Sequence, residues 1–250
     1  MTIDNSKTLE RIKILTELHG APGFEDEVRS YMKSEMEPYV DKFIQNKMGG
    51  FYGIKKSNKE NAPRVMIAAH IANIPKHFRT GNESIPQIKD LMLDIGASSS
   101  EDVRNRGVEV GDTIVPHTIM TQLSKNRYSA KAWDNRYGCV LAIEILELLK
   151  DVQLDVDLYV GANVQEEVGL RGAKAAAKQI DPDIAFVVDC SPANDIKGKQ
   201  QLSGVLGEGT LIRIKDGTMI LKPLFRDYLL KLAEENQIAY QYYISPGGTD

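Results

Sequence analysis

The chain has 250 residues, 42% of them hydrophobic and 26% charged, a composition typical of a globular protein with a sizeable core. Its formal net charge is −4 and its Lys and Arg residues are scattered, so we expect neither nucleic acid nor a membrane surface as a partner. No apolar stretch approaches the length of a membrane span, the first residues do not resemble a secretion signal, and the only cysteines, Cys139 and Cys190, form no disulfide framework. These features predict a cytoplasmic protein.

The first part of the chain predicts two amphipathic helices followed by strands. Apolar residues recur at helical spacing over residues 6–18 and 25–36, and Pro38 ends the second helix. The run Val-Met-Ile-Ala-Ala is typical of a buried strand and leads directly into His70. Strands are expected at residues 39–45, 51–54 and 65–69.

The last half of the chain alternates strands and helices. Strands are expected at residues 128–133, 158–164, 184–188, 210–214 and 238–244, and helices at 137–149, 173–179 and 224–235. Such an alternation favours a sheet with helices on both faces. We therefore predict an α/β fold, a three-layer α/β/α sandwich with a mostly parallel central sheet.

Residues 72–127 interrupt this alternation with prolines, a serine run and Gly-containing turn signals. We predict an inserted small β-rich domain there, made of short strands and loops. The α/β domain would then comprise residues 1–71 and 128–250.

Acidic residues and a histidine follow the apolar strands at the points where those strands end. They are His70, Asp134, Glu166, Glu167 and Asp189. In an open α/β sheet, ligands bind beyond the carboxyl ends of the strands, so we expect these side chains to converge although they are distant in sequence. Imidazole combined with carboxylates suits zinc, cobalt or manganese.

Each of these residues also has a structural interpretation. Asp134 precedes a long helix and could be its N-cap, Asp189 could form an Asx turn, and His70 could be a hydrogen-bonded core residue. Taken together, these interpretations are less plausible, because all must hold at equivalent strand ends. The sequence has no Gly-x-Ser-x-Gly, His-Glu-x-x-His or phosphate-binding loop motif, which disfavours covalent catalysis.

Five blocks of the sequence resemble those of one enzyme family. They are AAH (68–70), KAWDNRYG (131–138), NVQEEVGLRGA (163–173), VVDCSPAND (187–195) and YQYYISPGGTD (240–250). They are similar to the motifs of the dinuclear-metal aminopeptidases that include glutamyl aminopeptidase and the large tetrahedral dodecameric peptidases. The likeness extends in order over nearly the whole chain.

This resemblance implies a role for each strand-end residue. Asp134 would bridge two divalent metal ions, His70 and Asp189 would complete one metal site, and Glu167 would belong to the other. Glu166 would be the general base that takes a proton from a metal-activated water. Two adjacent glutamates would thus serve different purposes, with the cations offsetting their repulsion.

The sequence departs from the family pattern at two points. The family follows the histidine with Met-Asp-Glu-Ile-Gly, whose Asp supports the metal site, whereas Ile71, Ala72 and Asn73 follow His70 here. The family also continues past its Gly-Gly-Thr-Asp motif to a late histidine that ligates the second metal. The other histidines, His19, His77 and His117, match no family motif, and we assign them to a helix end and to loops. We therefore expect a weakened second metal site. The chain is either a genuinely shortened protein or part of a longer one, and the two departures favour the second.

The resemblance predicts a metal-dependent aminopeptidase that removes N-terminal residues from short peptides. It also implies a homo-oligomer, from dimer to dodecamer, with residues 72–127 as the remnant of an inserted partial-barrel domain that the family uses for dimerisation. Two alternatives stay open at this point. One is a glycoside hydrolase, which would use two carboxylates without a metal, and the other is a non-catalytic family member that only assembles.

Overall fold

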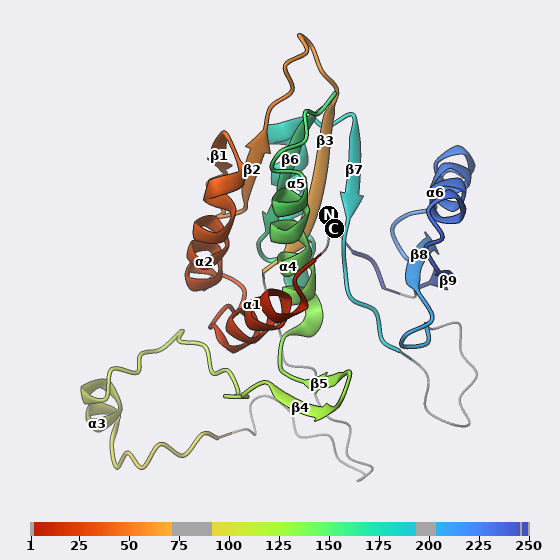
Figure 1. Cartoon of the computed structure of the whole chain (residues 1–250). Coiled ribbons are helices and arrows are strands. Elements are labelled where there is room, and N and C mark those ends of the chain that lie inside the picture. Colours follow the sequence, from red (N-terminus) through yellow and green to blue (C-terminus); the bar gives the residue numbers. More distant parts are fainter. Residues whose placement is uncertain (1–2, 72–91, 194–203, 246, 250) are drawn as a thin grey trace.

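The computed structural model describes residues 3–71, 92–193, 204–245 and 247–249. Its centre is a five-stranded sheet with the strand order β1-β2-β6-β3-β7 (Figure 1). The strands are β1 (Lys42–Gln45), β2 (Phe51–Lys55), β3 (Arg64–His70), β6 (Asp157–Asn163) and β7 (Ile184–Val187).

The sheet is mixed, because β2 runs opposite to the other four strands, so the prediction of a mostly parallel sheet is confirmed only in part. Strand β3 runs parallel to both neighbours, β6 and β7, whereas β2 is antiparallel to both of its neighbours, β1 and β6. The cause is the short connection between β1 and β2, because a tight turn can join only antiparallel strands. Asn46 forms this turn by accepting the N–H groups of Met48 and Gly50 on its side chain.

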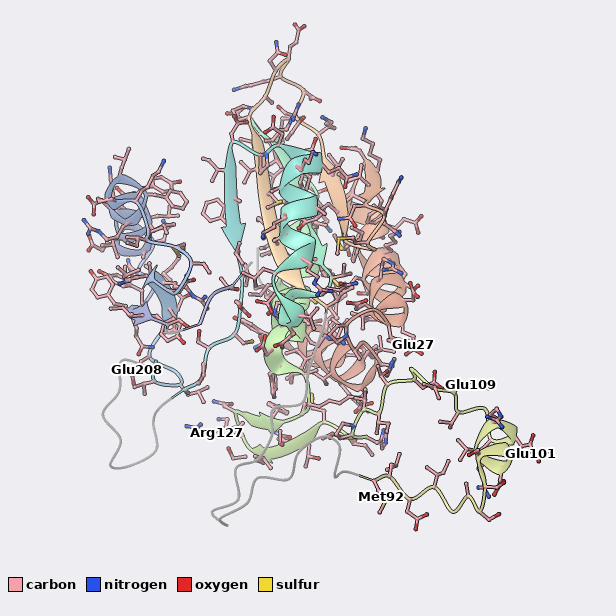
Figure 2. All side chains as sticks on the ribbon, turned by 180° about the vertical axis from the view of Figure 1, so that it is seen from behind. Glu27, Met92, Glu101, Glu109, Arg127 and Glu208 are labelled. Carbon is pink, nitrogen blue, oxygen red and sulfur yellow. The ribbon has the colours of Figure 1, made fainter. Side chains whose placement is uncertain are left out.

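Helices cover both faces of the sheet, as the sandwich prediction requires. On one face lie α1 (Asn5–Glu17), α2 (Asp26–Met36) and α4 (Trp133–Leu148), and on the other lies α5 (Arg171–Ile180) (Figures 1 and 2). Each face has its own buried apolar cluster. None of the helices in the described ranges is both long enough and apolar enough to cross a membrane.

Strand β6 shows how the alternation of side chains builds the two clusters. All seven of its residues are buried. Leu158 and Val160 pack with α4 residues such as Ile143 on one face, while Tyr159 packs with Ile180 of α5 on the other. A strand buried on both faces and paired on both edges provides a rigid support for residues that follow its end.

The segment before α4 differs from the prediction. The strand expected at 128–133 is only β5 (Arg127–Ser129), which forms an antiparallel hairpin with β4 (Thr121–Ser124). Asp134 and Asn135 of α4 have non-helical backbone angles, so the regular helix begins close to the predicted position at Tyr137. The predicted strand does not reach residue 133, because Ala132 has a φ of 59°, in the left-handed region. A strand cannot continue through that conformation.

The last strands do not extend the main sheet within the described residues. β8 (Thr210–Lys215) and β9 (Tyr240–Ile244) form a separate parallel pair joined through α6 (Pro223–Glu235). This pair and α6 lie beyond β7 in Figure 1. Phe225 of α6 contacts Phe186 of β7, with ring centroids 5.4 Å apart.

The described part of the predicted insertion, residues 92–127, lies away from the sheet (Figures 1 and 2). It contains a short helix that the sequence did not predict, α3 (Ser100–Asn105), whose first turn is capped because the side chain of Ser99 accepts the N–H of Asp102. Strand β4 lies near the end of this segment. A small β-rich domain over 72–127 stays a prediction, since residues 72–91 lie outside the described ranges.

We expect Gly161→Ala to destabilise the protein, because this glycine lies where β6 and β2 approach closely. A Cβ atom at this position would stand 2.0 Å from the carbonyl oxygen of Phe51 and 2.6 Å from Cα of Tyr52. Forcing these backbones apart should lower the free energy of unfolding by about 1–3 kcal/mol, measured by urea denaturation. Gly247→Ala is the control, because the nearest atom lies 4.0 Å away; equal unfolding midpoints for the two variants would contradict the expectation.

Candidate metal centre

Three adjacent parallel strands deliver three of the predicted site residues to one end of the sheet. His70 is the last residue of β3 and pairs with Asn163, the last residue of β6, while Val187 at the end of β7 pairs with Ala68 of β3. The segments that follow β6 and β7 carry Glu166 and Asp189. These three residues therefore lie at the same end of the sheet.

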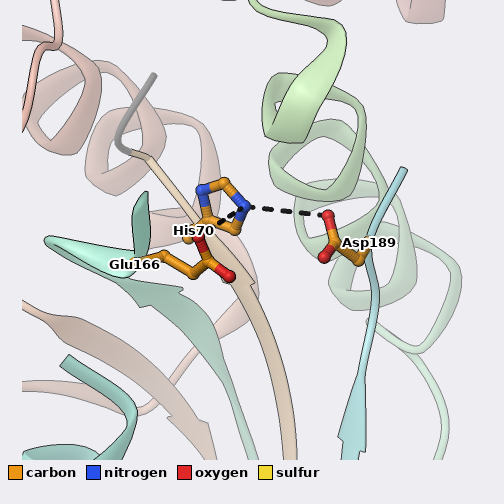
Figure 3. A group of neighbouring side chains, drawn as sticks. All are labelled: His70, Glu166 and Asp189. Carbon is orange, nitrogen blue, oxygen red and sulfur yellow. Dashed lines mark ion pairs between the residues drawn. The ribbon is translucent and has the colours of Figure 1, made fainter. Parts of the chain in front are cut away.

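The imidazole of His70 stands among three carboxylates. Its Nε2 atom lies 3.1 Å from Asp134 Oδ1, 3.7 Å from Asp189 Oδ1 and 3.9 Å from Glu166 Oε2. His70, Glu166 and Asp189 each offer one ligand atom, and these atoms lie within 4.8 Å of one another (Figure 3). His70 is 2% exposed and Glu166 is 9% exposed, so the cluster is largely withdrawn from water.

Asp134 reaches the cluster through an irregular start of α4. Neither Asp134 nor Asn135 has helical φ and ψ angles, and the peptide bond between them is cis. Asn135 accepts the N–H of Gly138 on its side chain and donates to the carbonyl oxygen of Val188, 2.7 Å away, just beyond β7. Asn135 thus forms the capping bond for which Asp134 was a candidate, and Asp134 approaches His70 instead.

The charges of the cluster call for a cation. Burial disfavours the protonated imidazole of His70, but hydrogen bonds to Asp134 and Asp189 and the charges of Asp189 and Glu166 outweigh it and raise the pKa of His70 to about 10. Burial likewise opposes ionisation of Asp189, yet hydrogen bonds from His70 and Thr249 hold the pKa of its carboxyl below the usual value. An imidazole nitrogen together with carboxylate oxygens forms a donor set that suits a divalent transition metal ion such as zinc.

We expect the metal-free protein to lose stability as the pH rises from about 6.5 to about 10. The folded state raises the pKa of His70, so the protonated imidazole stabilises the fold fully below pH 6.5, and this contribution disappears as the pH passes through 10. The loss should be on the order of a few kcal/mol. Urea midpoints measured with chelator at several pH values test this, with His70→Gln as the comparison; a parallel pH dependence in that variant would contradict the assignment to His70.

The structure also identifies a residue that the sequence did not mark. Glu25, at the start of α2, is 3% exposed and accepts the N–H of Gln165 at 3.1 Å and that of Gly23 at 2.9 Å. Gln165 has a φ of 55° and directly precedes Glu166. Glu25 thereby holds the turn that carries Glu166, and no local pattern could reveal a contact between residues 140 positions apart.

Other predicted residues lie outside the cluster. Glu167 is half-buried on the same 3-10 turn as Glu166 (Glu166–Val168) but is not part of the group of three, so its role as a ligand stays a prediction. His19 follows the end of α1 and lies 3.2 Å from the hydroxyl of Thr113, and His117 lies in a loop, as predicted. His77 falls outside the described residues.

Comparison with known proteins gives consistent matches. The family model described as M42 glutamyl aminopeptidase matches residues 71–250. A glutamyl aminopeptidase of Lactococcus lactis is 36% identical over 296 aligned positions, which cover 96% of this chain and 82% of that protein. A solved aminopeptidase from Desulfurococcus kamchatkensis is 32% identical with a TM-score of 0.89, covering 98% of this chain and 82% of that chain. A TET aminopeptidase from a Thaumarchaeota archaeon is 30% identical with a TM-score of 0.88, covering 98% and 83%.

Proposed function

This chain belongs to the M42 glutamyl aminopeptidase family and is a metal-dependent aminopeptidase, and we propose that the cluster at His70 is the site where it hydrolyses peptides. The observation that carries the proposal is the convergence of Asp134, Glu166 and Asp189 on the Nε2 atom of His70. The substrates would be short peptides with a free amino terminus, from which one residue is removed.

Each residue of the cluster has its own proposed role. His70, Asp134 and Asp189 hold a divalent cation, because they supply one imidazole nitrogen and two carboxylates at the ends of rigid elements. When bound, such a cation acidifies water and stabilises negative charge on the scissile carbonyl oxygen. Glu166 is the general base: it accepts a proton from the attacking water and later gives it to the leaving amine.

We propose that a second cation position binds more weakly. For that position the sequence offers Asp134, shared with the first cation, and Glu167. Two carboxylates make a poorer donor set than the imidazole and two carboxylates of the first position. Metal analysis after dialysis against a metal-free buffer should therefore find one tightly held ion per chain, and two tightly held ions would contradict this proposal.

The aminopeptidase assignment is tested with aminoacyl anilides that release a chromophore. The chelated protein should be inactive, and added zinc, cobalt or manganese should restore hydrolysis. N-acetylated anilides are the control, because an aminopeptidase requires a free α-amino group. A panel that includes Glu, Asp, Lys and Leu substrates would identify the preferred side chain.

The alternatives make different predictions in the same assays. A glycoside hydrolase would cleave oligosaccharides and keep its activity in chelator, and membership of the peptidase family does not favour it. A non-catalytic assembly subunit would cleave none of the anilides at any metal concentration. Equal rates before and after chelation would count against the proposed site.

We propose that the chain assembles with copies of itself. Residues 92–123 carry exposed apolar side chains away from the sheet, among them Met92, Val110, Ile114 and Leu123. Large apolar side chains left exposed in one segment become buried when that segment contacts another chain. Light scattering should find more than one chain per particle. We also propose a cytoplasmic location, because Cys139 and Cys190 form no disulfide in the described part of the chain.

A further inference from the structure

The two oxygens of Asp189 have different surroundings. Oδ1 lies 3.7 Å from His70 Nε2 and accepts the N–H of Cys190 at 2.8 Å. Oδ2 faces the other way, where it accepts a hydrogen bond from the Thr249 hydroxyl and lies 4.0 Å from Nη2 of Arg213. The side chain of Asp189 is 14% exposed, so these contacts determine its orientation.

Arg213, on β8, is itself held firmly. Its Nη1 atom lies 3.1 Å from Oδ2 of Asp216, and its guanidinium carbon lies 5.5 Å from the ring centroid of Tyr243 on β9. The Asp216 side chain is fully buried and accepts the N–H groups of Thr218 and Met219, at 2.6 and 2.8 Å. The guanidinium therefore has a fixed place before any cation binds.

These contacts join two parts of the fold that share no strand pairing in the described residues. The β8 and β9 pair is separate from the five-stranded sheet. Arg213 comes from this pair and Thr249 from the segment after β9, and both reach Asp189 just beyond β7. The orientation of Asp189 thus depends on how the β8 and β9 pair sits against the main sheet.

We propose that Arg213 and Thr249 are positioning residues that hold Oδ2 of Asp189, so that Oδ1 faces the cation position beside His70. This inference rests on the proposed function, since it assigns a task at the same site. Neither residue touches the reacting atoms. Thr249 acts through a hydrogen bond and Arg213 through an ion pair at 4.0 Å. Replacing a residue that orients a metal ligand commonly changes metal affinity by about 10–100-fold.

The sign of the effect separates positioning from simple electrostatics. Arg213 carries a positive charge 4.0 Å from Asp189 and repels a cation bound there. If charge alone mattered, Arg213→Gln would strengthen zinc binding and Arg213→Lys would leave it unchanged. Positioning predicts weaker binding in both variants, because lysine keeps the charge but lacks the planar fork that binds Asp216 and reaches Asp189.

The test measures zinc affinity of the full chain by competition with a chromophoric chelator. Arg213→Gln, Arg213→Lys and Thr249→Val should each bind zinc about tenfold more weakly, and Thr249→Ser, which keeps the hydroxyl, should bind as the wild type does. The control is Arg226→Gln, which removes an exposed ion pair with Asp227 on α6. It should not change the affinity.

The absorption spectrum of the cobalt-loaded protein gives a second readout that does not depend on activity. Its bands should shift in Thr249→Val and not in Arg226→Gln, because they report ligand geometry. The inference would be overturned if Asp189→Asn binds zinc weakly but Thr249→Val and Arg213→Lys both bind it as the wild type does. If Asp189→Asn itself binds zinc as the wild type does, the metal site is wrongly placed and the proposed function fails with it.

Discussion

Glu166→Gln is expected to lower kcat for aminoacyl anilides by about 10²–10⁴-fold, the usual contribution of a positioned general base. The amide has nearly the shape of the carboxylate but cannot accept the proton of the attacking water. Zinc affinity should change much less, because His70, Asp134 and Asp189 stay in place. Steady-state kinetics at saturating zinc, together with chelator competition, separate the two effects.

Two controls define this result. Glu60→Gln changes an exposed glutamate in the turn between β2 and β3, at the opposite end of β3 from His70, and should leave kcat unaltered. Glu167→Gln changes the neighbouring carboxylate and should act through the second cation, so that its loss of rate decreases at high zinc. A Glu166→Gln enzyme with wild-type kcat would remove Glu166 from the mechanism.

Asp134→Asn is expected to weaken zinc binding by at least about 10–100-fold. Asp134 Oδ1 lies 3.1 Å from His70 Nε2, so its charge is one of those that compensate a cation at this position. At limiting zinc the rate of hydrolysis should fall in proportion to the loss of zinc affinity, and at high zinc it should recover in part. Asp151→Asn, at a side chain 74% exposed, is the matched control; equal zinc affinities of the two variants would contradict a ligand role for Asp134.

The strand ends were the part of the site that the sequence could predict. A run of apolar residues that stops at a histidine or a carboxylate, as at His70 and Asp189, combines a buried strand with a polar group that has to be satisfied. Such a pattern is local and can be read without coordinates. It predicted the convergence on one end of the sheet, although it did not predict that β2 would be antiparallel to β6.

The supporting residues could not be predicted in the same way. Glu25 contacts the residue before Glu166 from the start of α2, and Arg213 reaches Asp189 from a separate pair of strands. Both contacts depend on tertiary packing between distant segments. Local backbone rules also fail near the site: Ala132 and Gln165 have φ values of 59° and 55°, which are unfavourable for these residue types.

The failures of local rules coincide with the site itself. Ala132 lies two residues before Asp134, and Gln165 lies one residue before Glu166. The irregular backbone from Ala132 to Asn135 precedes the regular part of α4, and Asp134 in this segment lies beside His70. Departures from propensity at such positions are common where function determines the backbone.

The most direct measurement is the anomalous scattering of zinc in crystals of the zinc-loaded protein. The account predicts a peak within about 2.0–2.2 Å of His70 Nε2 and of a carboxylate oxygen from both Asp134 and Asp189, the usual zinc distances. A fully occupied zinc peak elsewhere would contradict this account. So would the absence of a zinc peak at this position in protein that hydrolyses anilides.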